Sequence, residues 1–319
     1  MKRKLTSLCT FLLTISAVFA QQIPQYSQYN FNHYLLNPAV AGVSKYLEAQ
    51  MGVRAQWLGF EGSPTTIFAS VHLPLDYPIG NTHIKEKPHQ GIGGYMFRDQ
   101  TGPISNTGVY GSYSYHLKVS RESRLALGVS LGLKQYAIDG TRINFTQSDF
   151  DPKVSGKKES YLVPDGTIGA WYHTKHVFAG LSMNQIFTNR LDIEQPVSVE
   201  DFGKLDHHYS LNVGYIYDLN SYIKLVPSVL FKAVAPAPLQ MDVSLKTVFD
   251  EQYWVGASMR NFDAFVVFAG FIHGNFEVGY AFDLTFNAIQ KHSAGSHEII
   301  VGLILPRFEH DVLCPARFW

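Results

Sequence analysis

The sequence has few charged residues and no excess of either sign. Asp, Glu, Lys and Arg make up 16% of the 319 residues, against an ordinary share of about 25%. The 26 basic residues balance the 26 acidic ones. The chain therefore lacks the overall positive charge with which nucleic-acid-binding proteins neutralise phosphates, and we expect no nucleic-acid partner.

Cysteine is almost absent. The chain contains only Cys9 and Cys314, and Cys9 lies inside a predicted leader peptide. Removal of the leader would leave one cysteine, which excludes a disulfide framework within one chain. Cys314 is interpreted as a free thiol.

Residues 1–20 have the pattern of a cleaved signal peptide. A basic start, Lys2-Arg3-Lys4, precedes a mostly apolar stretch, and Val18-Phe19-Ala20 resembles a small-residue cleavage site. The alternative is a short N-terminal membrane anchor, but the stretch is short for a span and a polar tract follows it. We therefore expect an exported protein.

Long hydrophobic runs are missing beyond the leader. The longest, residues 264–272, has about half the length that a membrane-spanning helix needs. The chain is instead rich in aromatic residues, at 14%, and contains 26 glycines. This combination is typical of a transmembrane β-barrel, which we expect in the outer membrane of a Gram-negative bacterium, surrounded by outer-membrane lipid.

Apolar residues alternate with polar or small ones over many segments. In residues 47–57, for example, the alternate residues Leu47, Ala49, Met51 and Val53 are apolar and those between them are mostly polar. A strand places these two sets on opposite faces. A soluble β-sandwich also alternates, but the small polar face and the aromatics near strand ends favour a barrel with lipid outside and a polar lumen.

The predicted fold is all-β, a transmembrane antiparallel β-barrel of about 14 strands with an N-terminal plug or periplasmic segment. We expect the plug or docking segment at residues 21–45, the barrel at 46–306 and a C-terminal tail at 307–319. The predicted strands are 46–58, 65–75, 91–99, 106–119, 124–138, 165–174, 177–187, 207–218, 222–233, 239–249, 252–260, 264–272, 275–286 and 297–305.

The lengths of the connections support this topology. With the first strand starting in the periplasm, the long connections 139–164, 188–206 and 287–296 face outward and most short turns face the periplasm, which is the outer-membrane pattern. The connection 76–90 is long yet falls on the periplasmic side. Pro227, inside a predicted strand, is a second exception because proline suits edges and bulges.

No arrangement of residues indicates catalysis or metal binding. The segment Gly128-Val129-Ser130-Leu131-Gly132 matches a nucleophile-elbow pattern, but that motif needs a turn and a helix where the strand alternation continues. No histidine pair has convincing metal-ligand spacing. We expect no catalytic residue, no cofactor and no metal, and a barrel enzyme such as a lipase is not favoured.

The predicted lumen carries charges of both signs. The inward set contains Glu48, Arg54, Lys118, Lys134, Lys224, Lys232, Asp242, Lys246, Arg260, Glu277 and Asp283. Such groups are expected to pair across a narrow lumen, because an isolated desolvated charge is costly. A structural lining is favoured over a selective ion pathway, which stays open as the alternative.

The stretch that follows the leader is rich in Gln, Asn and Tyr. Such a segment can form hydrogen bonds with a polar lumen wall, so a plug or a periplasmic docking strap is predicted, and a disordered leader is the alternative. Because it follows the leader and precedes the first strand, we expect it to begin on the periplasmic side.

Several blocks of this sequence resemble the PorP/SprF family of type IX secretion outer-membrane proteins. The matching blocks are QYSQYNFNHYLLNPAVAG (25–42), HIKEKPHQGIGGYMFRDQTGPIS (83–105), TGVYGSYSYHL (107–117), SHEIIVGL (296–303) and the closing CPARFW. The resemblance implies a non-enzymatic outer-membrane barrel that works with the type IX secretion or gliding machinery. It also implies a role in export or surface attachment of large cargo proteins such as adhesins.

The partner-binding residues are predicted in two regions. These are the opening stretch and the loops 139–164 and 188–206, and the candidates are Tyr26, Tyr29, Tyr34, Asn37, Pro38, Phe145, Phe150 and Tyr161. The alternative function is an outer-membrane channel for small hydrophobic molecules, similar in outline to fatty-acid transporters, which also combine an N-terminal hatch with about 14 strands.

Overall fold

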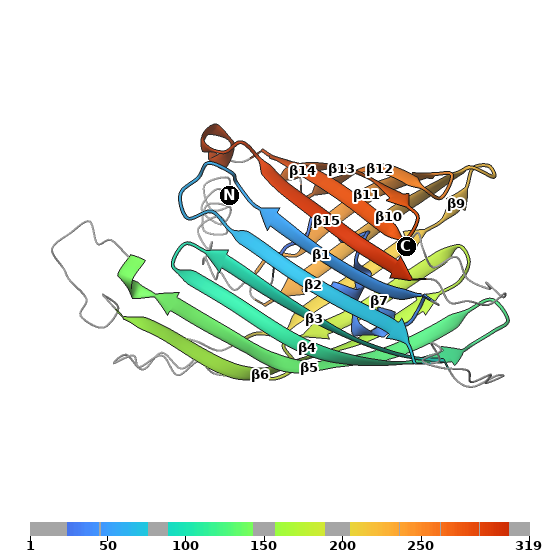
Figure 1. The fold of residues 1–319 in the computed structure, drawn as a ribbon, viewed down its shortest axis with the longest axis horizontal. Helices are drawn as coiled ribbons and strands as arrows, with labels where there is room; N and C mark the ends of the chain where they lie inside the picture. The colour runs from blue at the N-terminus through green and yellow to red at the C-terminus, as the bar shows by residue number, and fades with distance from the viewer. Residues whose placement is uncertain are drawn as a thin grey trace, which may run out of the picture.

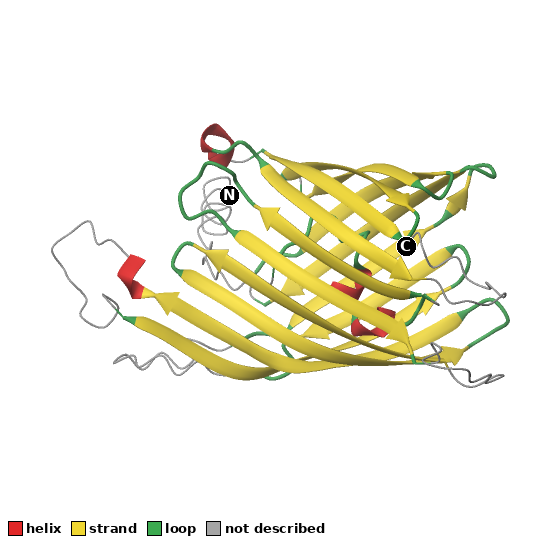
Figure 2. Ribbon diagram, in the orientation of Figure 1, coloured by secondary structure: helices red, strands yellow, loops and turns green. Residues whose placement is uncertain are grey.

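A computed structural model describes residues 24–44, 46–75, 89–142, 157–188, 205–235, 237–261, 263–286 and 288–305. These residues form a closed antiparallel barrel of 14 strands, which confirms the predicted fold class. The barrel is shown in Figures 1 and 2. No helix within the described ranges is long and apolar enough to cross a membrane.

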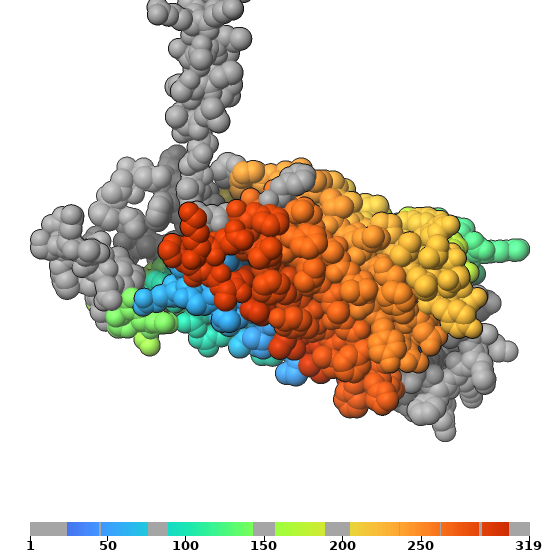
Figure 3. All heavy atoms as spheres, turned by 90° about the horizontal axis from the view of Figure 1, so that it is seen from above, coloured from blue at the N-terminus to red at the C-terminus, as the bar shows by residue number. Residues whose placement is uncertain are grey.

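The strands follow one another around the wall in chain order, and β1 pairs with β15 to close it. Fifteen strands are labelled for the 14 positions in the wall, because β8 and β9 are two pieces at one position beside β10. Figure 3 shows one flank of this wall, where the atoms of the C-terminal strands pack side by side. The strands are β1 (Leu47–Ala55), β2 (Thr65–Pro74), β3 (His89–Thr101), β4 (Ile104–Lys118), β5 (Arg124–Asp139), β6 (Lys158–His173), β7 (Val177–Asn184), β8 (His208–Tyr215), β9 (Tyr217–Asp218), β10 (Ile223–Val234), β11 (Gln240–Phe249), β12 (Tyr253–Arg260), β13 (Ala264–His273), β14 (Phe276–Thr285) and β15 (Ser296–Leu305).

The alternation in sequence corresponds to two faces of the wall. On β1 the apolar residue Met51 is 61% exposed, whereas Arg54 on the other face is 2% exposed. The outward face carries the exposed leucines, valines and aromatics that lipid would cover. The inward face carries small and polar residues, and its charged members point into the lumen.

Several of the sequence predictions require correction. Residues 158–164, predicted as part of a connection, belong to β6. Residues 207–218, predicted as one strand, form β8 and the short β9, and both pair with β10. The interruption lies beside Pro227, which has no N–H to offer the ladder, so the proline sits at a break between two pieces of strand. Lys118, predicted to face the lumen, is exposed at the end of β4.

The two ends of the barrel differ, and we name them by their connections. The loop end carries the connections that follow β1, β3, β5, β7, β10, β12 and β14, and the turn end carries the others. In Figure 1 the β5–β6 hairpin extends farthest at the loop end. The leader, most of the long connections 76–90, 139–164 and 188–206, and the C-terminal tail lie outside the described residues.

Four short 3-10 helices accompany the described strands. Two of them, η1 (His33–Leu35) and η2 (Pro38–Val40), precede β1, while η3 (Gly140–Arg142) and η4 (Ala288–His292) lie in connections of the loop end. Figure 2 shows η1 and η2 enclosed by the strands. Residues 24–44 therefore occupy the lumen, and we call this segment the plug.

Candidate functional site

The plug runs through the lumen from the loop end to the turn end, antiparallel to β1. Almost all of its residues are buried. Its start contacts Asp283 and Glu298, near the loop-end limits of β14 and β15, and its end contacts His116, near the turn-end limit of β4. The described plug thus begins at the loop end, not at the periplasmic turn end that was expected from its place in the sequence. The reason is that its charged partners lie at the loop end.

A buried group of five charged side chains anchors the start of the plug, and we call it the ion cluster. Its members are Arg54, Asp242, Arg260, Asp283 and Glu298. Arg54 Nη2 lies 2.9 Å from Asp283 Oδ2, and Arg260 lies 3.2 Å from both Asp242 and Asp283. With two cations and three carboxylates, the cluster needs further hydrogen-bond donors, since a buried anion must be compensated.

The plug supplies these donors. The main-chain N–H groups of Ser27 and Gln28 donate to the two carboxylate oxygens of Glu298, at 2.7 and 3.0 Å. The Ser27 hydroxyl donates to Asp283 at 2.7 Å and accepts from Arg54. Hydrogen bonds to ionised acceptors are the stronger kind. The plug is therefore part of the charge balance of the lumen.

Asparagines hold the middle of the plug. Asn30 donates to Ser244 at 2.7 Å and accepts from Ser228 at 3.0 Å. Asn32 donates to Ser70 at 2.9 Å, and its side-chain oxygen accepts from Leu35 N and so caps η1. An amide side chain has both donors and acceptors, so each asparagine joins the plug to the wall, and Asn32 also orders the backbone of the plug.

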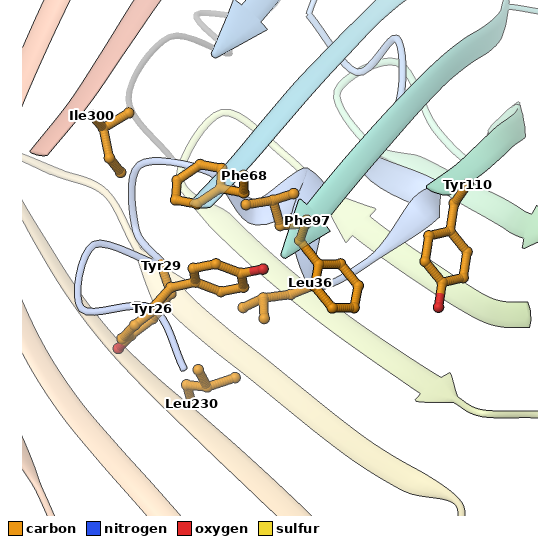
Figure 4. Packing of buried hydrophobic residues seen from close by; sticks show 9 residues of the cluster. Tyr26, Tyr29, Leu36, Phe68, Phe97, Tyr110, Leu230 and Ile300 are labelled. Carbon is orange, nitrogen blue, oxygen red and sulfur yellow. The ribbon is translucent and has the colours of Figure 1, made fainter. Parts of the chain in front are cut away.

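Aromatic side chains fill the space between the plug and the wall. Tyr26 meets Phe68 edge to face with ring centroids 5.0 Å apart, and Figure 4 shows this part of the core. Phe31 packs on Trp254 at 4.8 Å. The Tyr34 hydroxyl donates to Ser112 at 2.8 Å. These contacts combine apolar burial with a hydrogen-bonding end, which suits tyrosine in a partly polar lumen.

The tyrosines of the plug are held in their neutral form. Burial raises the pKa of Tyr29 and of Tyr34 to about 12, from an ordinary value of 10.0. Both hydroxyl groups donate hydrogen bonds, Tyr29 to Asp242 O at 3.4 Å and Tyr34 to Ser112. A charged phenolate would lose the bond that it donates and would be poorly solvated there.

The Asn37-Pro38-Ala39 segment fits into the wall itself. Asn37 donates to the carbonyl oxygens of Ala170 and Leu181 at 2.9 and 3.2 Å, and its oxygen accepts from Ala39 N at 3.0 Å. The wall is hollowed here by glycine. A Cβ atom on Gly128 would lie 2.3 Å from Ala39 N, and one on Gly169 would lie 2.0 Å from Asn37 Oδ1.

The last residues of the plug are bound at the turn end. The carbonyl oxygen of Ala41 accepts from Ser114 Oγ at 2.5 Å and lies 2.9 Å from His116 Nε2. Gly42, with φ of +68°, turns the chain toward β1, and its carbonyl oxygen contacts the His89 ring. The plug is thus fixed at both ends and along its length.

The match to a family model decides the identity of this barrel. The model described as type IX secretion system membrane protein PorP/SprF matches residues 18–303. The chain belongs to the PorP/SprF family. The family resemblance seen in the sequence is thereby confirmed, and membership makes this protein an outer-membrane component of the type IX secretion system.

Solved structures share the barrel architecture with this PorP/SprF protein at low sequence identity. The TodX ΔS2S3 mutant monoaromatic hydrocarbon channel is 8% identical, with 87% of this chain and 94% of that chain covered and a TM-score of 0.51. A FadL homologue of Pseudomonas aeruginosa is 11% identical, with coverages of 90% and 95% and a TM-score of 0.47. No curated protein matches the sequence. These likenesses concern the fold alone.

The predicted partner-binding residues of the PorP/SprF barrel fall into three groups. Tyr26, Tyr29, Tyr34, Asn37 and Pro38 are buried in the lumen, where the wall is their partner in this structure. Tyr161, on β6, is half-buried and donates to Glu159 at 2.8 Å. Phe145 and Phe150 lie outside the described residues. Contact of any of them with another protein stays a prediction.

Glu298 and Asp165 are lumen residues that the sequence analysis missed. Glu298 is completely buried and is the anchor of the plug backbone, and Asp165 accepts from the Tyr110 hydroxyl at 2.6 Å. The alternation of apolar and polar residues around Glu298 was a signal that could have placed it on the inward face of its strand. Its pairing opposite Arg54 in the β1–β15 register could not be seen without the closed barrel.

The space left in the lumen is divided. Beside the plug lie cavities of about 70 and 40 Å³, and a larger one of about 340 Å³ lies at the loop end. Within the described parts of the chain, no group of three or more His, Cys, Asp or Glu side chains is placed to hold a metal ion. Ser130, inside β5, is buried and bonds to Ser112 at 2.5 Å.

Proposed function

We propose that this PorP/SprF barrel is a non-enzymatic, plugged component that supports export or surface attachment of particular large cargo proteins, such as adhesins. Its partners are then other proteins of the type IX secretion and gliding machinery and the cargo itself, with outer-membrane lipid around the barrel. Family membership supports the secretion context. The cargo role is our extension of it.

The observation that carries this proposal is the occupied lumen. Residues 24–44 occupy the lumen, and the cavities beside them, about 70 and 40 Å³, are far below the roughly 300 Å³ at which pockets for small ligands begin. The cavity of about 340 Å³ lies at the loop end, beyond the start of the plug. A barrel filled by its own chain is poorly suited to diffusion of solutes. What it offers to other molecules is mainly its surfaces.

The surfaces at the loop end are the best candidates for cargo contact. The outer-membrane pattern places the longer connections outside the cell, so the connection between β5 and β6 and the connection between β7 and β8 face the cargo in this proposal. Phe145 and Phe150 in the first loop are candidate aromatic anchors, because interfaces take much of their binding energy from a few aromatic residues.

The second candidate function is transport of a small hydrophobic molecule. The observation in its favour is the fold shared with the TodX channel. The cavity of about 340 Å³ at the loop end argues against it, because Arg54, Lys232, Arg260 and Asp283 are among the residues that line it. A hydrophobic solute there would remove water from these charged groups without replacing their hydrogen bonds, which is costly.

Comparison of a deletion strain with its parent tests the proposed role. We expect one or a few large surface proteins to be lost from the cell surface or released into the medium, while most secreted proteins remain. The plasmid-borne wild-type gene should restore them. A variant that loosens the plug, Gly128→Ala, is compared with the matched variant Gly111→Ala at equal barrel levels.

Each outcome of this comparison is informative. Loss of most secreted proteins would contradict a cargo-specific role and indicate a general part of the secretion channel. An unchanged proteome with reduced uptake of a small hydrophobic nutrient would favour the transport function. Catalytic turnover of a surface substrate that depends on this barrel would contradict a non-enzymatic role.

A further inference from the structure

Strand β6 extends well beyond its neighbour β7 at the loop end. It pairs with β5 over all of its 16 residues, from Lys158 to His173, but with β7 only from Thr167 onward. Within the described part of the chain, residues 158–166 therefore have a partner strand on one side only. The β5–β6 hairpin projects with this open edge at the lower left of Figure 1.

Two hydrogen bonds show which residues of β6 face the open side. Residues of an antiparallel strand alternate between those that bond to one neighbour and those that face away from it. The carbonyl oxygen of Lys157 accepts from Gly140 N on the β5 side, whereas that of Gly166 accepts from Ile186 N on the other side. The odd-numbered residues of β6 thus bond to β5, and the even-numbered residues face the open side.

Ser160 and Leu162 present complete main-chain groups on this open side. Their N–H and C=O groups make no hydrogen bond with any residue that the structure describes, and both residues are exposed. On the outer face of the sheet, Gln135 Nε2 donates to the Ser160 hydroxyl at 3.1 Å, so this face is polar at the level of the edge. Open sheet edges do not occur in contact with hydrocarbon, so this part of β6 stands in water above the lipid.

We propose that the edge of β6 at Ser160 and Leu162 binds an extended segment of an exported protein as an added β-strand. Unpaired N–H and C=O groups at strand spacing are complemented by the main chain of another strand. The side chain of Leu162, which is 64% exposed, would pack beside an apolar residue of the added strand. The loop end faces outward in the outer-membrane pattern, and naming the segment as cargo rests on the proposed function.

A second copy of this barrel fits the edge less well. Strands of outer-membrane barrels tilt by about 35–45° from the membrane normal. Two copies related by a two-fold axis along the normal would therefore cross their β6 strands at about 70–90°. Paired strands are rotated by only about 20–25° from each other, so the added strand comes from a different protein.

Peptide binding to the purified full-length barrel in detergent tests the edge. The probe is the fluorescently labelled peptide Glu-Thr-Val-Thr-Val-Thr-Lys-amide, compared with the same peptide N-methylated at every residue, which has no main-chain donor. Fluorescence anisotropy gives a Kd for each peptide. We expect the unmodified peptide to bind at least about tenfold more tightly, because methylation removes its main-chain hydrogen bonds to the edge.

Leu162→Pro removes one N–H of the edge and no bond between β5 and β6, and Pro164 on the same side shows that the strand accepts proline. It should weaken binding of the unmodified peptide about tenfold. The conservative variant Leu162→Thr keeps the N–H and should stay within about fivefold of the wild type. Arg121→Pro, in an exposed turn at the turn end, is the matched proline control and should not change the Kd.

The same variants test the cargo part in cells. At a normal level of barrel in the outer membrane, Leu162→Pro should lose the surface proteins that the deletion strain loses. Leu162→Thr and Arg121→Pro should retain them.

Equal Kd values for the two peptides, or an unchanged Kd in Leu162→Pro, would overturn strand addition. The peptide comparison uses the wild-type barrel, so it decides even if Leu162→Pro fails to assemble. A dimer of the purified barrel that Leu162→Pro converts to a monomer would overturn the exported protein as occupant. Surface proteins that are lost in the deletion strain but kept in Leu162→Pro would overturn this inference and leave the proposed export role intact. A deletion strain that loses no surface protein would instead refute the export role and the cargo part, and the peptides would still decide strand addition.

Discussion

Replacing Gly128 with alanine is expected to loosen the plug while the barrel stays closed. Gly128 lies on β5 and faces the plug at η2. The added Cβ would lie 2.3 Å from Ala39 N and 2.5 Å from Ala39 Cα. These are backbone atoms, which cannot move aside by a change of rotamer. The ladder bonds of β5 to β4 and β6 do not involve the side chain, so the wall itself is retained.

The size of the effect follows from this overlap. Adding a methyl group to a well-packed core costs about 1–3 kcal/mol when the surroundings must shift. Because 1.4 kcal/mol is a factor of ten, release of η2 from the wall should become about 5- to 150-fold more frequent. A glycine-to-alanine substitution also stabilises the folded protein by about 0.4–1 kcal/mol, because it lowers the conformational entropy of the unfolded chain. The control must therefore be a glycine-to-alanine substitution as well.

Hydrogen exchange measured by mass spectrometry reports this release directly. Peptides that cover residues 33–44 should exchange faster in Gly128→Ala by the stated factor, while peptides from β5 and its neighbours should be unchanged. Gly111→Ala is the matched control, because Gly111 also lies in a strand of the wall and a Cβ there meets no atom within 4 Å.

Unchanged exchange of residues 33–44 in a folded Gly128→Ala barrel would refute this reasoning. It would mean that the wall yields at little cost and that the glycine is not required by the plug. Equal acceleration in Gly111→Ala would refute it as well, since that substitution meets no plug atom.

Three further predictions concern the plug and the lumen. Arg54→Met leaves buried carboxylates without a counter-ion and should lower the free energy of unfolding by about 3–5 kcal/mol, measured in urea titrations followed by gel mobility. Lys224→Met removes a partly exposed ion pair and should lower it by less than about 1 kcal/mol. Equal losses in the two variants would contradict the buried ion cluster. Asn37→Ala removes two hydrogen bonds to the wall and the N-cap of η2, and should weaken binding of the plug to the wall by roughly 1–3 kcal/mol. Hydrogen exchange of the η2 amides should become faster, and unchanged exchange would contradict the prediction. The pKa of Tyr29 and Tyr34 is raised to about 12, so the stability that these neutral tyrosines contribute is complete below pH 10 and lost as the pH rises through 12; ultraviolet titration that shows every tyrosine ionising near pH 10 would contradict this.

The barrel was predictable from the sequence because its two environments are so different. Lipid outside and a crowded lumen inside impose an apolar-to-small alternation, as at Leu131 and Ser130. The predicted strand bounds were less accurate where a strand end consists of polar residues. The strand β6 starts at Lys158 rather than at residue 165, because its first residues lie toward the end of a long hairpin and include Lys158, Glu159 and Ser160.

The position of the plug was only partly predictable. A segment rich in Asn, Gln and Tyr indicated contact with a polar lumen, and residues 24–44 make such contacts. Its direction depends on Asp283 and Glu298, whose inward positions matter only once β14 and β15 have closed against β1. The pairing of distant strands is not encoded in any local pattern, so the ion cluster could not be derived from spacing.

The bonds between the plug and the last strands have a consequence for the order of assembly. Ser27 is 271 residues from Glu298 and 256 from Asp283 along the chain. Contacts at such separation form late, because the chain must first lose the entropy of a very long loop. The first folded segment of the protein therefore cannot settle until the final two strands arrive. Pairing of β1 with β15 and binding of the plug to the wall therefore occur together. A chain truncated before β14 is expected to have a barrel that does not close and an N-terminal segment that is not bound to the wall.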